Sequence, residues 1–183
     1  TISDMIKDEF IDEFYEKHGK TKFIGYEEKE AKAKILHINK SHGSSNYEII
    51  FDQTPFYAES GGQVADTGII NSQDLFEGKV VNVIKKKDVY IHEVELIKGI
   101  IPKIGDELTL KIDKFKRKDT QRNHTATHIL HKALREVLGS HVEQSGSLVD
   151  SERLRFDFSH YEAVSPEQIE AIERIANQIV LEN

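Results

Sequence analysis

The sequence has no cysteine, and this absence excludes several kinds of chemistry. Without thiols, the 183 residues supply no disulfide, no thiolate nucleophile and no thiolate ligand for a metal ion. An apolar run near twenty residues is also missing, so the sequence predicts no membrane-spanning helix. The first residues, TISDMIKDEF, lack the basic region and apolar block of a secretory signal. Together these absences indicate a cytoplasmic protein.

The chain also lacks a general excess of positive charge. Its formal net charge is −7, which argues against a protein coated in basic surface for gripping nucleic acid. Basic residues nevertheless outnumber acidic ones between Lys111 and Arg122. This stretch is either a solvated basic turn or a contact for phosphates, and a phosphate contact would weaken steeply with salt.

Residues 1–20 read as a helix that ends a preceding domain or linker. Ile2, Ile6, Phe10 and Phe14 follow one another at i+4 spacing, which is typical of an amphipathic helix over residues 2–18. Gly19 is well placed to end it in a left-handed conformation. Such a helix needs a partner surface for its apolar stripe.

Residues 21–116 carry β signals separated by turn residues. Alternating apolar residues occur at 47–51 and 108–112, and the segments 80–84 and 89–96 are rich in β-branched residues. Several short strands spaced in this way predict a small antiparallel barrel, whose strand order the sequence does not reveal.

Residues 117–183 return to helical periodicity. A helix is predicted over 120–138 and ends at Gly139, and strands follow at 141–149 and 153–158. A last helix begins after Ser165, with Pro166 in its first position. Such a helix–strand–strand–helix unit leaves two sheet edges open, which indicates an incomplete core. The predicted fold class is α+β: a short N-terminal helix, a small antiparallel barrel and this incomplete α+β core.

His124 and His128 are the first candidate site. On a helix they lie one turn apart, a spacing at which two imidazoles bind one divalent ion in zinc enzymes. His131 shares their face, and it or residues beyond Asn183 could complete the ligand set. The alternative is an exposed pair that arose by chance. Because no Glu follows His124, the motif is not that of an HExxH protease.

A paired glycine gives the second candidate site. Gly61 and Gly62 permit positive φ and let a ligand or another backbone come close, although a tight turn is the simpler interpretation. With Gln63 they form a GGQ tripeptide, which resembles the loop of peptide-release factors that directs water at an ester on a tRNA end.

These two segments carry a family resemblance. TPFYAESGGQVADTG, then RNHTATHILHKALREVLGSHVEQSGSLV, then LRFDFSH are very similar in order and spacing to the editing region of alanyl-tRNA synthetases. They also resemble free-standing alanyl-tRNA editing proteins. The similarity covers about residues 22–183.

The resemblance implies a glycine-motif barrel before an editing core of the type shared with threonyl-tRNA synthetases. That core hydrolyses Ser-tRNA(Ala) or Gly-tRNA(Ala), while ATP is used elsewhere in the synthetase. Zinc is held by an HxxxH pair, matched by His124 and His128, and by a CxxxH pair that these residues lack, which leaves a half-site. We therefore expect tRNA(Ala) and the rest of the synthetase chain as partners, and no membrane.

The resemblance also implies roles for individual residues. His124, His128 and Gln144 are the expected catalytic residues, and Gln144 matches a glutamine that lines the amino-acid pocket. The expected substrate-binding residues are Gln144, Ser145, Gly61, Gly62 and Gln63, and Ser147 is a further neighbour. Two alternatives stay open: a non-catalytic module that docks tRNA or a partner, and a piece of a free-standing deacylase.

Overall fold

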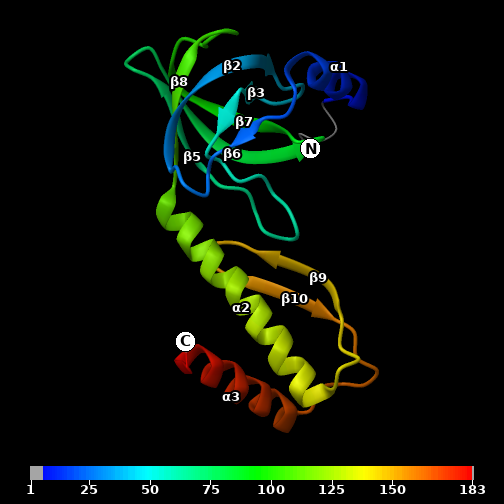
Figure 1. Cartoon of the computed structure of the whole chain (residues 1–183). Helices are drawn as coiled ribbons and strands as arrows, with labels where there is room; N and C mark the ends of the chain where they lie inside the picture. Colours follow the sequence, from blue (N-terminus) through cyan, green and yellow to red (C-terminus); the bar gives the residue numbers. More distant parts are fainter. Residues whose placement is uncertain (1–5, 183) are drawn as a thin grey trace. The chain divides into compact units, whose positions relative to one another are not determined.

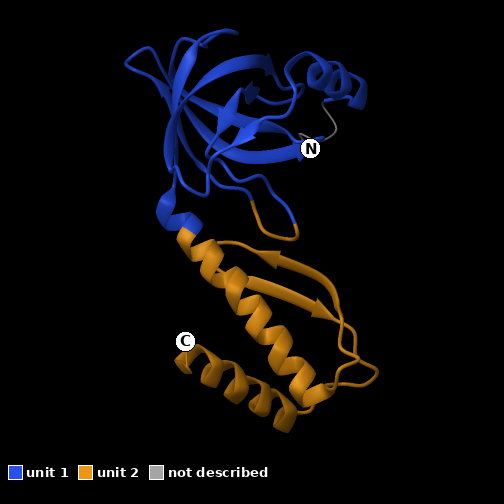
Figure 2. Ribbon diagram, viewed as in Figure 1, with its two compact units in different colours: residues 1–60, 65–117 blue, residues 61–64, 118–183 orange. Residues whose placement is uncertain are grey.

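The computed structural model describes residues 6–182, which form two compact units (Figure 2). Unit 1 comprises residues 1–60 and 65–117, and unit 2 comprises residues 61–64 and 118–183. The short segment 61–64 thus belongs to unit 2 although its neighbours in sequence belong to unit 1. No helix in the described part of the chain is long and apolar enough to cross a membrane.

Unit 1 is built on a closed six-stranded antiparallel barrel with the strand order β2-β3-β7-β6-β5-β8 (Figure 1). The barrel strands are β2 (Glu30–Lys40), β3 (Tyr47–Phe51), β5 (Gly68–Ser72), β6 (Phe76–Lys86), β7 (Val89–Gly99) and β8 (Glu107–Ile112). A separate parallel pair joins β1 (Lys22–Phe23) to β4 (Gln53–Thr54). The predicted small antiparallel barrel is confirmed.

The barrel encloses one apolar core. Alternate residues of β3 and β8 point inward, so Ile49, Phe51, Leu108 and Leu110 are almost completely buried. This is the alternation that the sequence shows at 47–51 and 108–112. Closing the sheet removes the free edges that an open sheet would present.

Helix α1 (Asp8–His18) packs on the outside of the barrel (Figure 1). Its buried residues Ile11 and Phe14 join a cluster with Ile50, Ile84 and Ile91 on the barrel strands. The helix ends at His18, as predicted, and the Gly19 N–H donates to the Tyr15 carbonyl at 2.7 Å. Gly19 has a positive φ of 73°, but its ψ of −163° differs from the predicted left-handed helical conformation. The helix was predicted over residues 2–18 but begins at Asp8, so Ile6 and Lys7 lie outside it. Residues 2–5 lie outside the described residues.

A buried histidine lies in the barrel. His92 is fully buried; its Nδ1 lies 3.0 Å from the Ile49 carbonyl and its Nε2 lies 2.8 Å from Thr54 Oγ1. Because a carbonyl only accepts, Nδ1 carries the proton and Nε2 accepts from the threonine hydroxyl. Burial lowers the pKa of His92 to about 4, against the hydrogen bond to Ile49, which raises it.

Acid is expected to destabilise unit 1 through His92. Between pH 6.5 and about 4 the unfolded histidine takes up a proton while the folded one stays neutral, so the free energy of unfolding falls by about 3 kcal/mol as the pH drops. Urea unfolding at several pH values should show a smaller loss for His92→Gln over this range than for the unmodified chain. The exposed His42→Gln is the matched control. Equal pH slopes for all three would contradict the assignment.

An ion pair is buried where α2 (Lys114–Leu138) begins. Arg117 Nε lies 3.0 Å from both carboxylate oxygens of Asp66, and its NH2 donates to the same carboxylate. The guanidinium also donates to the Gly25 and Pro55 carbonyls. Both charged side chains are about 5–6% exposed, so each charge depends on the other and on these hydrogen bonds.

Arg117→Ala is expected to lower the free energy of unfolding of unit 1 by about 3–5 kcal/mol, because Asp66 is left buried without a cationic partner. Exposed Lys118, the next residue along α2, is the matched control, and Lys118→Ala should change the value by less than about 0.5 kcal/mol. Chemical denaturation compares the two variants. Similar losses would show that the buried ion pair has no special weight.

Helix α2 begins six residues before the predicted start at 120. Asp113 Oδ1 accepts the Lys116 N–H at 3.0 Å and so caps the helix. The first turns of α2 carry lysines and arginines rather than an apolar stripe, so hydrophobic periodicity does not identify them as helical. The basic stretch is therefore the end of β8 and the start of a helix, not a turn.

Unit 2 packs a hairpin and two helices around a small core. The strands β9 (Gln144–Val149) and β10 (Leu154–Phe158) pair antiparallel, and α3 (Pro166–Glu182) follows. The core residues are Ala133, Leu134, Leu138, Val142 and Ile172. Ser165 and Gln168 exchange hydrogen bonds at 2.9 and 3.1 Å in a capping box before α3. The predicted helices and strands are present, and the first strand begins three residues later than expected.

Candidate active site

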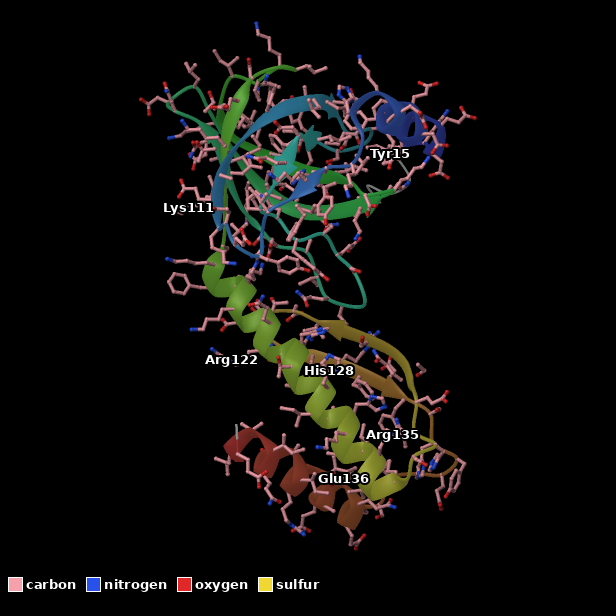
Figure 3. The ribbon with its side chains drawn as sticks, viewed as in Figure 1. Tyr15, Lys111, Arg122, His128, Arg135 and Glu136 are labelled. Atoms are coloured by element: carbon pink, nitrogen blue, oxygen red, sulfur yellow. The ribbon has the colours of Figure 1, made fainter. Side chains whose placement is uncertain are left out.

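The two histidines of the HxxxH motif lie side by side on α2. Their Nε2 atoms are 3.3 Å apart, and their rings stand at 81° with centroids 4.9 Å apart. His128 is exposed, and Figure 3 labels it midway along the helix. Zinc binds imidazole nitrogens at about 2.0–2.1 Å, so two nitrogens on one tetrahedral ion lie about 3.3–3.4 Å apart. The pair therefore fits two positions of a tetrahedral zinc site.

The third histidine of the helix does not join the pair. His131 Nε2 lies 3.4 Å from the Val142 carbonyl, and its ring lies 5.3 Å from that of Phe156. Within residues 6–182 there is no group of three His, Cys, Asp or Glu side chains that could hold a metal ion. His124 Nδ1 is buried and has no hydrogen-bond partner in that range. The described residues thus offer two ligands to a metal.

A shallow depression of about 440 Å³ adjoins the histidine pair. It is lined by His128, His131, Lys132, Arg135 and Glu136, and Figure 3 shows three of these along α2. The lining thus combines two imidazoles with two cationic side chains and one carboxylate, that of Glu136.

Three segments of unit 2 meet at the end of β9. The Val149 N–H donates to the Gly62 carbonyl at 2.8 Å, and the Val149 carbonyl accepts the Val64 N–H at 3.0 Å. Asn123, the neighbour of His124, donates its side-chain amide to the Asp150 carbonyl at 2.9 Å. The glycine segment and the histidine-bearing turn of α2 are therefore both fastened to β9.

The paired glycines behave differently from each other. Both have positive φ, 56° at Gly61 and 82° at Gly62. A Cβ at Gly61 would meet nothing within 4 Å, whereas one at Gly62 would lie 2.5 Å from Ser147 Oγ and 2.6 Å from its carbonyl oxygen. Of the two positions, only residue 62 must therefore be glycine to allow the close approach of β9. Gln63 forms an isolated bridge with Val149.

The predicted amino-acid-binding residues lie on β9. The Gln144 amide nitrogen donates to Ser147 Oγ at 2.8 Å, and both side chains reach the surface. Ser145 is exposed and is an extra residue in the pairing of β9 with β10. The contact between Gln144 and Ser147 was not predicted, because the sequence does not reveal where a strand is irregular. The sequence also did not predict the contact of Asn123 with Asp150, although the position of Asn123 next to His124 makes it a candidate for a supporting role.

The comparisons with known proteins agree with this architecture. The family model described as "tRNA synthetases class II (A)" matches residues 3–116. The alanine–tRNA ligases of Fusobacterium nucleatum and Parvibaculum lavamentivorans are 56% and 45% identical over 96% and 93% of the chain. That of Pelotomaculum thermopropionicum is 43% identical over 96%. These alignments take in unit 2 as well as unit 1.

The family match places the chain among the class II tRNA synthetases. Within that class it belongs to the alanine–tRNA ligase family. The chain spans about a fifth of the length of the curated relatives it matches.

Gly62→Ala is expected to destabilise unit 2 by about 1–3 kcal/mol more than Gly61→Ala. Both variants place a β-carbon at a positive φ, and only the one at residue 62 also clashes with Ser147. Urea unfolding followed by a probe in unit 2 measures the difference. Equal destabilisation by the two variants would show that β9 does not approach Gly62 as described.

Proposed function

We propose that this chain is part of the editing region of an alanyl-tRNA synthetase. In this proposal it acts on tRNA(Ala) that carries serine or glycine, and hydrolyses the ester that joins the amino acid to the terminal ribose. The observation that carries the proposal is the separation of the two Nε2 atoms on α2, which suits a shared metal ion. Membership of the alanine–tRNA ligase family supports the substrate class.

Editing follows from the limits of binding small side chains. A pocket shaped for alanine cannot strongly reject glycine, because one missing methyl group is worth only about 1–3 kcal/mol. Serine adds one hydroxyl, which such a pocket also excludes poorly. A second site that hydrolyses the wrong esters and spares Ala-tRNA(Ala) corrects both errors. Charging with alanine and the use of ATP belong to other parts of a synthetase in the cytoplasm.

The residues of this chain would divide the work of ester hydrolysis. The oxygen of water adds to the ester carbonyl, the bond to the ribose oxygen breaks, and a proton from the water passes to that ribose oxygen, which releases the free amino acid and the tRNA. His124 and His128 would hold zinc, with further ligands from elsewhere in the synthetase. A bound zinc ion supplies Lewis acidity, which lowers the pKa of a bound water towards about 7 or orients the substrate.

The other site residues bind and position. Gln144 offers an amide to the side chain of the misplaced amino acid, and a serine hydroxyl is its natural hydrogen-bond partner. Gly62 and Gln63 support β9 through their contacts with Val149, and Gly61 is the residue that leads into them. In this account the glycine segment acts by holding the strand that carries Gln144.

The start of α2 is the proposed contact with the RNA backbone. Lys114, Lys118 and Arg122 recur every four residues and therefore follow one stripe of the helix. Their side chains are exposed, and exposed Phe115 has the Lys114 ammonium 5.5 Å from its ring centroid. Such a stripe binds phosphates with an affinity that falls with rising salt.

Hydrolysis of Ser-tRNA(Ala) by the full-length product of the gene tests the proposal. Replacing both His124 and His128 by Ala should lower the rate by at least about a hundredfold, because the metal loses these ligands. The bound zinc per molecule, measured by atomic spectroscopy, should fall as well. His42→Ala, an exposed histidine in unit 1, is the matched control and should change neither value.

Full hydrolysis by the double histidine variant would exclude the assigned role. If the unmodified protein bound tRNA(Ala) but hydrolysed neither misacylated form, the non-catalytic docking module would be the better account.

A further inference from the structure

The strand that carries Gln144 is irregular at one position. Opposite β10, Gly146 pairs with Asp157 and Gln144 pairs with Phe158, so Ser145 is an extra residue with no partner of its own. This is a β-bulge, which inserts one residue into a strand and redirects the side chains beyond it.

The bulge decides which face of the hairpin Gln144 occupies. In a regular strand, residues three apart point to opposite faces, so Gln144 and Ser147 would be separated by the sheet. With Ser145 left out of the pairing, Gln144 and Ser147 share one face and form their 2.8 Å hydrogen bond. Without the bulge, Ser145 would take the place of Gln144.

That face also carries two aromatic residues of β10. Directly paired residues share a face, so Gln144 and Ser147 lie with Phe158 and Phe156, which pack against the core formed with α2 and α3. The Phe156 ring in turn contacts His131 of α2. Arg155 and Asp157 lie on the other face, 3.4 Å apart. The bulge thus directs Gln144 towards the side of the hairpin on which the histidine-bearing helix lies.

Ser147 is held on both sides. Its hydroxyl receives the Gln144 amide, and the backbone of Gly62 lies so close that a β-carbon there would meet Ser147 Oγ and its carbonyl. Serine is among the smallest residues that can offer an oxygen at this point, and the close glycine backbone restricts its movement. In the structure the Ser147 hydroxyl accepts from the Gln144 NH2 group and thereby holds the amide in place.

The rotation matters because the two ends of an amide differ. The NH2 group only donates and the carbonyl oxygen Oε1 only accepts. Once the NH2 group is engaged by Ser147, the end left for a ligand is Oε1, which accepts a hydrogen bond from a hydroxyl. A seryl ester supplies that hydroxyl, and a glycyl ester does not.

We propose that Ser147 is a positioning residue for substrate specificity: by binding the Gln144 amide nitrogen, it presents Oε1 to the hydroxyl of serine on misacylated tRNA. This inference rests on the proposed editing function and adds a residue that acts through Gln144. It predicts that the Ser147 hydroxyl matters for one of the two esters only.

The test compares two substrates in the full-length product of the gene. Ser147→Ala should slow the hydrolysis of Ser-tRNA(Ala) by about five- to tenfold, the effect of one neutral hydrogen bond, and leave Gly-tRNA(Ala) within about twofold. Ser151→Ala, in the turn after β9, is the matched control and should leave both rates unchanged. Retained hydrolysis of the glycyl ester also shows that Ser147→Ala folds.

A double-mutant cycle separates positioning from a direct role. If Ser147 acts through Gln144, then Ser147→Ala has no further effect on Ser-tRNA(Ala) hydrolysis once Gln144→Ala is present. Independent, additive losses would overturn the inference, and so would equal losses for the seryl and glycyl esters. If the unmodified protein hydrolyses neither ester, the proposed function itself fails, and this inference fails with it.

Discussion

The pairing between the glycine segment and the end of β9 is the constraint on which unit 2 depends. The Val149 N–H donates to the Gly62 carbonyl, and the Val149 carbonyl accepts the Val64 N–H. Val149 thus joins the chain to a segment more than eighty residues earlier in the sequence. The approach is so close that Gly62 leaves no room for a side chain beside Ser147. Residues 61–64, in the loop between β4 and β5, thus belong to unit 2. They bind β9, one of the two strands of the hairpin described in that unit.

Several features of the site follow from this attachment. Asn123 binds the Asp150 carbonyl, so the turn of α2 that carries His124 is tied to the same strand end. Along β9, the bulge at Ser145 places Gln144 on the face of Ser147. Imidazoles, amide and hydroxyl therefore belong to one small unit whose hydrogen bonds fix them locally. Unit 1, by contrast, is stabilised by its closed barrel and by the buried Arg117–Asp66 pair.

The elements with a clear period or end signal were predictable from the sequence. The alternation at 47–51 and 108–112, the stop at Gly139 and the start at Pro166 are local patterns, and the structure has them. Long-range pairings were not predictable. Arg117 reads as one more surface cation, and its burial depends on Asp66 far along the chain. The bulge at Ser145 was not predictable either, since an extra residue is defined only by its pairing with the partner strand. Nor was the need for glycine at position 62, which arises from the close approach of Ser147.

The most direct measurement is an NMR spectrum of the chain that reports contacts between protons of residues 62 and 147, together with the exchange of backbone amides. The account predicts nuclear Overhauser cross-peaks between the Gly62 α-protons and the Ser147 β-protons, and slow hydrogen exchange at the Val64 and Val149 amides, which are hydrogen-bonded in the structure. Missing cross-peaks together with rapid exchange at both amides would contradict it, because the glycine segment would then be free of β9.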